Sequence, residues 1–509
     1  MNMRDEISDP LPGIKNIQQG SGKGNVESLS IRTIPPIVWL MLLLLFPLAF
    51  FSRFVATTGS GFGSSFGPSI GAYVAWFIIG LWVLRGPDEA VEGLLLSLLL
   101  TLSNPYLFSA GEVALVARWI ILLLATIRVG YEYTRNPVSL PSWSMYLLLF
   151  VTFVTISSFF TSSWPVISLT RLLVFFLLAI VSYIGIRLGN RNWMATLIAF
   201  GAVTVIFSLP LLQSPIGYLR NGTQFQGILS HPQSYGVIIS ISLAAAIGYW
   251  ILDYDAHVRW YHVTLILVMG ATLVLSGARS GYLALLLALI ISIILHKSGS
   301  RAISRFMFNP ITYFGIAAIL LLILLQILKP QNMLRDFIFE RDVEAYSPYD
   351  LVIDPESSVA AYFLASRANL FARSWSNFLE HPLFGIGFGI PSTSASIVLT
   401  THVSGIPVSL PYEKGVIVAA TLEEVGIVGS ALLFLMIVGQ FRIVRKAARL
   451  SALLLFLTAL FINLGEAIYF AAGGIGVLIH IAIAVSLVTA ERQPLDTTAA
   501  SPDAQIQDY

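Results

Sequence analysis

The chain has 509 residues, of which 56% are apolar and only 11% are charged, and its mean hydropathy is +0.81. So few charged residues cannot cover a water-soluble globule of this length, and apolar runs of membrane-spanning length recur along the chain, so we expect an integral membrane protein. The absence of cysteine excludes disulfides, thiolate chemistry and cysteine-ligated metal. The formal net charge of +2 indicates no particular partner, and nothing in the sequence indicates nucleic acid.

Apolar runs bounded by glycine, proline and charge predict an all-α polytopic bundle of about 14 membrane-spanning helices. Polar residues 1–35 predict a disordered cytoplasmic tail. Residues 491–509 are predicted to form a cytoplasmic tail as well. Residues 36–328 hold about 11 of the spans and residues 416–490 about 3. The predicted spans are 36–52, 69–85, 91–108, 111–128, 144–161, 168–187, 193–212, 233–252, 260–277, 281–297, 311–328, 416–440, 450–470 and 473–490.

Basic residues fall unevenly on the two sides of the predicted bundle. With the amino terminus inside, the inner connections hold about 13 arginines and lysines, against about 5 on the outer side when the long loop is left out. This bias predicts that both termini are cytoplasmic. The outer residues are Arg53, Arg118, Arg171, Arg220 and Arg279.

The connection 329–415 is polar and rich in Asp, Glu, Ser and Pro, and the topology places it outside. It contains an amphipathic helix that we expect to begin near Asp354 and to stop at Pro382. Two interpretations stay open: the helix lies along the membrane surface, or it only covers the bundle. The apolar face of this helix consists of Leu364, Ala368, Phe371, Trp375 and Phe378.

Two outer arginines lie in tight polar segments, Arg220 before Asn221 and Gly222, and Arg279 in the turn Ser276–Gly281. A guanidinium group is a fixed fork that suits phosphate oxygens, so a pair on one face can hold a pyrophosphate. The alternatives are lipid headgroups or loop carboxylates as partners. Arg118, Arg171 and Glu466 lie within predicted spans, where they either line a polar cavity or reach toward the interface.

Four short motif blocks lie between Arg220 and Gly429. The first runs from Arg220 through His231-Pro232-Gln233-Ser234-Tyr235-Gly236, and the second is Leu275–Gly281. The third is Ser366-Arg367 followed by Trp375 and His381-Pro382-Leu383-Phe384-Gly385-Ile386-Gly387-Phe388-Gly389. The fourth is Leu422-Glu423-Glu424-Val425-Gly426-Ile427-Val428-Gly429. In this order the four blocks resemble the family of O-antigen ligases and O-antigen polymerases, which are bacterial envelope glycosyltransferases.

The resemblance implies a GT-C-like bundle with a large periplasmic loop, in the bacterial inner membrane, with its active site facing the periplasm. It implies transfer of glycan from an undecaprenyl-pyrophosphate donor to a glycan or lipid acceptor, with inversion and without metal or another cofactor. Arg220 and Arg279 are the implied pyrophosphate ligands, and Arg367 and Glu424 join Arg118, Arg171 and Glu466 as candidate residues of the cavity lining. Membrane lipids and polysaccharide-assembly proteins are the expected partners.

The chain departs from the family pattern where ligases usually carry a histidine, about nine residues before the glutamate of the last block. Gly415 occupies that place, so Glu413 is the first candidate for the general base and His402 the second. This departure favours a polymerase of O-antigen or exopolysaccharide over a ligase that acts on lipid A core. A flippase or transporter and a non-catalytic assembly scaffold remain as alternatives, although the chain lacks the duplicated halves typical of transporters.

Overall fold

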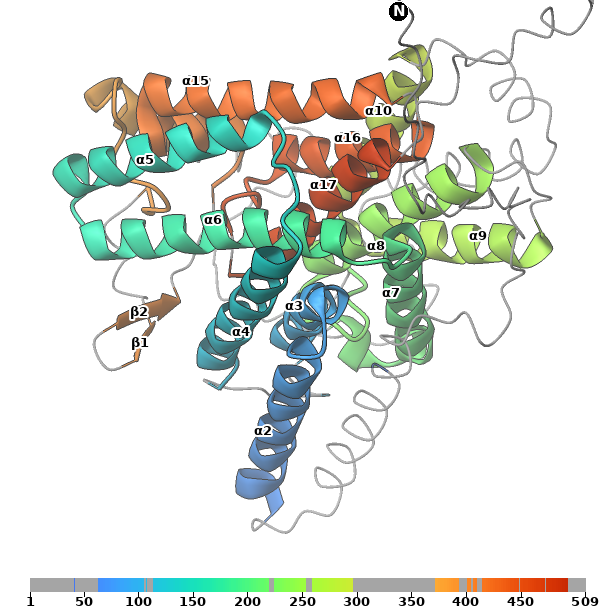
Figure 1. Cartoon of the computed structure of the whole chain (residues 1–509). Coiled ribbons are helices and arrows are strands. Elements are labelled where there is room, and N and C mark those ends of the chain that lie inside the picture. The colour runs from blue at the N-terminus through green and yellow to red at the C-terminus, as the bar shows by residue number, and fades with distance from the viewer. Residues whose placement is uncertain are drawn as a thin grey trace, which may run out of the picture. The chain divides into compact units, whose positions relative to one another are not determined.

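Figure 1 shows the computed structural model of the chain, in which helices make up most of the described residues. The structure describes residues 41, 63–104, 107, 113–218, 224–252, 259–295, 371–392, 401–403, 406–409, 414–447, 449–471 and 473–492. The long helices are α2 (Gly63–Val83), α3 (Pro87–Thr101), α4 (Val113–Arg135), α5 (Trp143–Thr161), α6 (Pro165–Leu188), α7 (Trp193–Ser208), α8 (Pro232–Ala246), α9 (Trp260–Leu275), α10 (Arg279–Leu295), α15 (Ile417–Lys446), α16 (Leu450–Gly465) and α17 (Gly476–Glu491).

Shorter elements complete the described chain. The 3-10 turns η2 (Leu209–Gln213) and η3 (Pro215–Tyr218) follow α7, and the π-helix η4 (Ile247–Leu252) extends α8. Residues 371–380 form a further helix. The strands β1 (Thr401–Val403) and β2 (Ile406–Ser409) pair as an antiparallel hairpin, which the sequence did not predict.

Several described helices are long and apolar enough to cross a membrane. Five meet both requirements: α5, α6, α7 with η2, α8 with η4, and α15. Parts of α2, and α9, α10, α16 and α17, are apolar but shorter. The chain is therefore an integral membrane protein with an essentially helical fold, while the full number of about 14 spans stays a prediction. The predicted spans 36–52 and 311–328, apart from Met41, lie outside the described residues.

Local sequence signals explain where helices begin and bend. Pro87, Pro165 and Pro232 occupy the first turns of α3, α6 and α8, where a missing backbone N–H costs nothing. The Asn192 side chain caps α7 by accepting from the Ala195 N–H at 3.2 Å. Gly426 interrupts α15 with φ 65° and ψ −169°, a conformation that side chains disfavour, so α15 is kinked one turn after Glu423.

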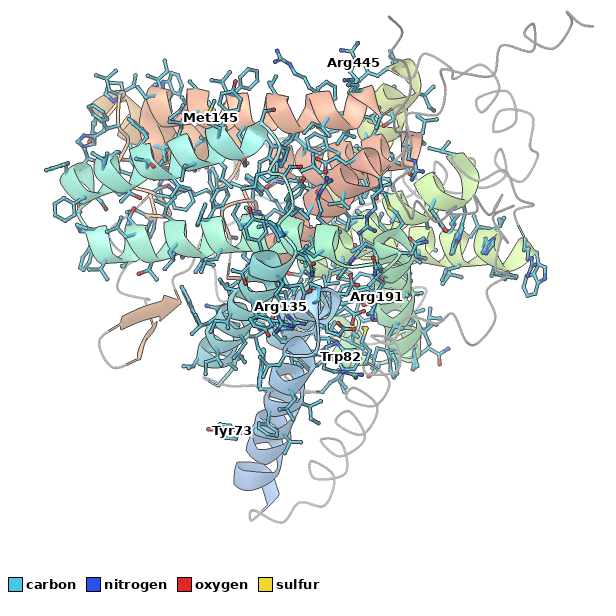
Figure 2. The ribbon with its side chains drawn as sticks, viewed as in Figure 1. Tyr73, Trp82, Arg135, Met145, Arg191 and Arg445 are labelled. Carbon is cyan, nitrogen blue, oxygen red and sulfur yellow. The ribbon has the colours of Figure 1, made fainter. Side chains whose placement is uncertain are left out.

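Apolar side chains both fill the helix interfaces and cover the outside of the bundle. The helix α15 packs against α5, and α10 packs against α16 (Figure 1). Large apolar side chains are nevertheless exposed, such as Met145 (57%), Phe160 (79%) and Phe434 (65%), and Tyr73 projects outward from α2 in Figure 2. In water such a surface would promote aggregation, whereas in a bilayer it is the surface that contacts lipid.

Ion pairs between basic and acidic residues cluster at one end of the helices, which we call the basic end. Arg191 pairs with Glu92, and Arg187 pairs with Glu491. All four residues belong to segments that the predicted topology places at or near the inner side. These contacts confirm that the segments share one end, while the assignment of that end to the cytoplasm stays a prediction.

The connections at the opposite end also contact one another, and we call it the motif end. It consists of residues 102–104, 224–231, 275–281, 381–392, 414–416, 465–471 and 473–475. The Asn104 N–H donates to the Ile228 carbonyl at 2.8 Å, and the Ala467 N–H donates to the Lys414 carbonyl at 3.3 Å. Connections predicted to alternate between two sides thus do gather at two ends.

Candidate functional site

The first two blocks pack on each other at the motif end. The Phe225 N–H donates to the Leu275 carbonyl at 3.1 Å, which ties the segment before α8 to the end of α9. The Ser276 hydroxyl accepts from the Ala278 N–H at 3.3 Å and shapes the turn that leads into α10. Arg279 is the first residue of α10 and is exposed. A polar turn that is held in this way can present a guanidinium group to a ligand.

The third and fourth blocks also pack on each other. The glycine-rich loop, residues 381–392, lies on the first turns of α15. The Gly387 N–H donates to the Glu424 carbonyl at 3.0 Å, and the Ile427 N–H donates to the Pro382 carbonyl at 2.9 Å. These carbonyl and N–H groups are open to the loop because the kink at Gly426 breaks the helical pattern. Two segments about 40 residues apart in the sequence therefore form one unit.

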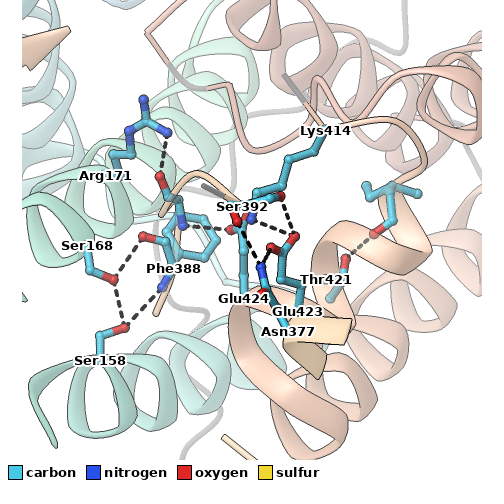
Figure 3. A network of polar contacts seen from close by, with 12 residues as sticks. Ser158, Ser168, Arg171, Asn377, Phe388, Ser392, Lys414, Thr421, Glu423 and Glu424 are labelled. Atoms are coloured by element: carbon cyan, nitrogen blue, oxygen red, sulfur yellow. Dashed lines mark hydrogen bonds and ion pairs between the residues drawn. The ribbon is translucent and has the colours of Figure 1, made fainter. Parts of the chain in front are cut away.

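A buried charge cluster joins this unit to the segment that precedes α15 (Figure 3). The Lys414 ammonium lies 3.0 Å from a Glu423 oxygen and 3.1 Å from a Glu424 oxygen. The lysine side chain is 1% exposed, and both glutamate side chains are 0% exposed. Charges removed from water to this degree are tolerated only when they are paired and hydrogen-bonded.

Neutral hydrogen-bond donors also contact both oxygens of the Glu423 carboxylate. The Asn377 amide donates to one carboxylate oxygen at 2.6 Å, and the Ser392 hydroxyl donates to the other at 3.1 Å. Asn377 lies in the helix 371–380 and Ser392 at the end of the glycine-rich loop. Glu423 thus holds the outer helix and the loop against α15.

The Gly389 backbone links Glu424 to an arginine of α6. Its N–H donates to the Glu424 carboxylate at 2.6 Å, and its carbonyl accepts from Arg171 Nη1 at 2.7 Å (Figure 3). Gly389 has φ +70°, and a Cβ there would collide with the Arg171 side chain. Only glycine therefore fits between the carboxylate and the arginine without strain.

Serine hydroxyls anchor the other side of the glycine-rich loop. The Ser168 hydroxyl donates to the Phe388 carbonyl at 2.8 Å and lies 2.9 Å from the Ser158 hydroxyl, which in turn accepts from the Phe388 N–H at 3.3 Å. The Phe388 ring is buried and packs edge-on against Phe175 and Phe470, 5.6 Å and 5.0 Å between ring centroids. The loop is consequently fixed between α5, α6 and α15.

The segment between α16 and α17 connects the two pairs of blocks. Glu466 accepts from the Ser280 hydroxyl at 3.1 Å, next to Arg279, while the following residue, Ala467, donates to the Lys414 carbonyl. Arg118 also reaches this segment, with Nη1 2.6 Å from the Gly473 carbonyl, and its charge interacts with that of Arg171. The residues expected to line a cavity, Arg118, Arg171, Glu424 and Glu466, thus all lie at the motif end, although the interactions described here are with the protein itself.

Four of the predicted site residues have no described side chain. Arg220, Arg367 and Glu413 lie outside the described residues. His402 is on β1, of which the backbone alone is described, opposite Pro407 in the register of the hairpin. Their predicted roles in pyrophosphate binding, cavity lining and proton transfer therefore stay predictions.

Sequence reasoning missed the pairing of Lys414 with Glu423 and the role of Asn377. A signal was present, because three charged residues within 414–424 border an apolar run, where a charge needs a partner. It also missed Asn104, whose side chain donates to the Ile216 and Gly227 carbonyls at 2.9 Å and 3.3 Å. Burial raises the pKa of the nearby Tyr218 hydroxyl to about 12, which keeps it protonated as a donor to Leu212.

Comparison with known proteins identifies one family. Residues 264–412 match the model of the family described as O-Antigen ligase. The match covers the second and third blocks, while the first and fourth lie on either side of it. No curated protein matched the chain. The match confirms the resemblance drawn from the four blocks: over residues 264–412, which are less than a third of the chain, the protein is similar to the O-antigen ligase family.

Proposed function

We propose that the protein is a membrane glycosyltransferase of the bacterial inner membrane. It takes glycan repeat units from an undecaprenyl-pyrophosphate carrier on the periplasmic face and polymerises them, with ligation to lipid A core as the alternative. The observation that supports this proposal best is the convergence of four blocks, spread over residues 224–429, at the end opposite the basic end. Convergence of distant polar segments at one surface is typical of a site and is not needed for packing alone.

In the proposed reaction, an acceptor hydroxyl oxygen attacks the anomeric carbon from the side opposite the leaving group. The new glycosidic bond forms as the bond between that carbon and the pyrophosphate oxygen breaks, and the configuration inverts. The hydroxyl proton passes to Glu413, or to His402 as second candidate, and the lipid pyrophosphate leaves with the bonding electrons.

Arg279 and Arg220 are proposed to bind the leaving pyrophosphate, whose negative charge grows as the bond breaks. The position of Arg279 supports this role because the residue is exposed at the start of α10. The adjacent Ser280 is hydrogen-bonded to Glu466, so the turn that carries Arg279 is held in place. Arginine donors fixed before the reaction lower its barrier without a cost of reorganisation.

The geometry favours a positioning role for Glu424 over a role as proton acceptor. One oxygen of its carboxylate pairs with Lys414 and the other binds the Gly389 N–H, and the side chain is inaccessible to solvent. A general base has to reach the acceptor hydroxyl within hydrogen-bonding distance, which a carboxylate committed to the protein on both oxygens does poorly. Glu424 instead supports the loop that contacts Arg171.

The proposal is tested by the length of the polysaccharide in a strain that lacks the protein. The strain is complemented with the wild type, Arg220→Ala, Arg279→Ala or Glu413→Ala, and envelope and secreted polysaccharide are separated on gels after protein levels are compared. Arg445→Ala is the matched control, because Arg445 is exposed in the last turn of α15, away from the motif end (Figure 2). The control is expected to behave as the wild type.

The pattern of products separates the candidate functions. Loss of long chains in both arginine variants, with single repeat units still transferred, supports a polymerase. Full-length polymer that remains on its carrier in these variants indicates a ligase. Normal glycan in both arginine variants at wild-type protein levels contradicts a catalytic function and favours an assembly scaffold.

A further inference from the structure

An exposed apolar stripe runs along the helix 371–380 and the turn that follows it. We define the aromatic stripe as Phe371, Trp375, Leu379, Leu383 and Phe384, which are 48%, 41%, 61%, 55% and 45% exposed. The first three residues are spaced by four, so they share one side of the helix. The Phe371 and Trp375 rings are nearly parallel, with 6.0 Å between their centroids and an angle of 8° between their planes. The stripe is thus one continuous surface that the described chain leaves open.

The opposite side of the same helix is committed to the protein. Ser374 is buried, and Asn377 donates to Glu423 at 2.6 Å and to the Ser392 carbonyl at 3.1 Å. The helix is therefore fixed by polar contacts on its inner face, while its largest apolar side chains point away from the cluster. A soluble domain would place these faces the other way round.

The aromatic stripe is continuous with surfaces that face the membrane. The Phe384 ring stacks on Phe153 of α5, 6.0 Å between centroids and 25° between planes. Leu149, Ile156 and Phe160 lie on the same face of α5 as Phe153 and are 47%, 55% and 79% exposed. On α15, Ile427 is 53% exposed beside Pro382.

The position of the Phe384–Phe153 contact along α5 indicates that lipid lies next to it. The helices α5 and α15 are candidate membrane spans with only 28% and 33% of their apolar windows buried in the protein, so much of each window is available to contact the bilayer. At about 1.5 Å per residue, Phe153 lies about 12 Å along α5 from its end at Thr161. A side chain stacked there lies within the thickness of the hydrocarbon core.

We propose that the aromatic stripe is a membrane-docking surface, and that its occupant is the bilayer leaflet on the motif side. The helix 371–380 lies against lipid through Phe371, Trp375 and Leu379, with the aromatic rings at the boundary between hydrocarbon and headgroups. On the inner face of the helix, Asn377 remains hydrogen-bonded to Glu423. One helix therefore contacts both the bilayer and the buried charge cluster. The proposal does not depend on glycan transfer.

The absence of cysteine from the chain allows a direct test of depth. The single-cysteine variant Leu379→Cys is spin-labelled and reconstituted in vesicles of phosphatidylethanolamine and phosphatidylglycerol. Arg373→Cys is the matched control, because Arg373 is exposed on the same helix but lies about 160° around the axis from Phe371 and about 120° from Leu379. Collisions with oxygen, which concentrates in the bilayer, and with a water-soluble nickel chelate are measured by power saturation.

Docking on lipid predicts opposite preferences for the two labels. The label at position 379 is relaxed more by oxygen than by nickel, while the label at position 373 is relaxed more by nickel. Leu383→Cys gives a second site on the stripe in case the first variant does not fold, and it is expected to prefer oxygen as well. Equal access of nickel to positions 379, 383 and 373 would overturn the proposal. Nickel access at 379 that is lost when a soluble oligosaccharide is added would also overturn it, in favour of a glycan-binding surface.

Discussion

Replacement of Lys414 by methionine tests the buried charge cluster most directly. The cluster has one ammonium and two carboxylates, a formal sum of +1 − 2 = −1, and the two ion pairs measure 3.0 Å and 3.1 Å. Methionine keeps most of the volume but leaves both carboxylates buried without this cation, a formal sum of −2. Breaking a buried pair in this way costs about 3–5 kcal/mol, because an uncompensated charge stays in the interior.

Glu424→Gln provides the comparison, because it removes one ion pair and takes the formal sum to zero. We expect it to be less destabilising than Lys414→Met, and we expect Lys414→Met to cost less in the Glu424→Gln background than in the wild type. The measurement is the apparent unfolding temperature in detergent at one fixed scan rate, with the exposed Arg445→Met as control. Equal unfolding temperatures for Lys414→Met and the control would refute the assignment of the cluster as a buried electrostatic unit.

Two further substitutions test the contacts around the cluster. Gly389→Ala is expected to lower the unfolding temperature and to reduce polymer length, because the new Cβ collides with Arg171. An alanine held at a φ of +70° also adds backbone strain of about 1–3 kcal/mol. Gly130→Ala, whose new Cβ has no atom within 4 Å, is the control in the same two assays. Asn377→Ala is expected to cost about 1–3 kcal/mol, since Glu423 loses a buried donor at 2.6 Å, whereas the exposed Ser376→Ala stays within about 0.5 kcal/mol in thermal unfolding. A Gly389→Ala protein as stable and active as Gly130→Ala, or an Asn377→Ala protein as stable as Ser376→Ala, would contradict these contacts.

Several elements of the fold could be predicted from neighbouring residues alone. The amino-terminal prolines of α3, α6 and α8 act within one turn, and the described helix 371–380 ends two residues before Pro382, as the sequence predicted. The alternation of connections between two ends follows from the lengths of the apolar runs. The extent of individual helices was less predictable: the expected span 91–108 gives a helix that ends at Thr101, before Pro105.

The partners of the site residues depended on contacts across the chain. The chain has few charges, so the sequence indicates that Lys414, Glu423 and Glu424 need partners, but nothing in their spacing says that they are partners of one another. Their contact requires the turn before α15 to bring residue 414 back onto the first turns of that helix. The carbonyl partners of Arg118 and Arg171 could not be predicted either, because any backbone carbonyl looks the same in a sequence.

The sequence by itself determined that the protein is a helical membrane protein and which blocks resemble the O-antigen ligase family, because hydropathy and short motifs are local properties of the chain. Only the tertiary structure decided that the four blocks meet as two pairs bridged through Glu466 and Ala467, and that the glycine-rich loop lies on the kink at Gly426. Which face of the helix 371–380 turns inward was decided in the same way: its polar face binds Glu423, and its apolar face stays open. These outcomes depend on which helix ends lie side by side, a property that arises when burial of the whole bundle is optimised together and that no single segment encodes.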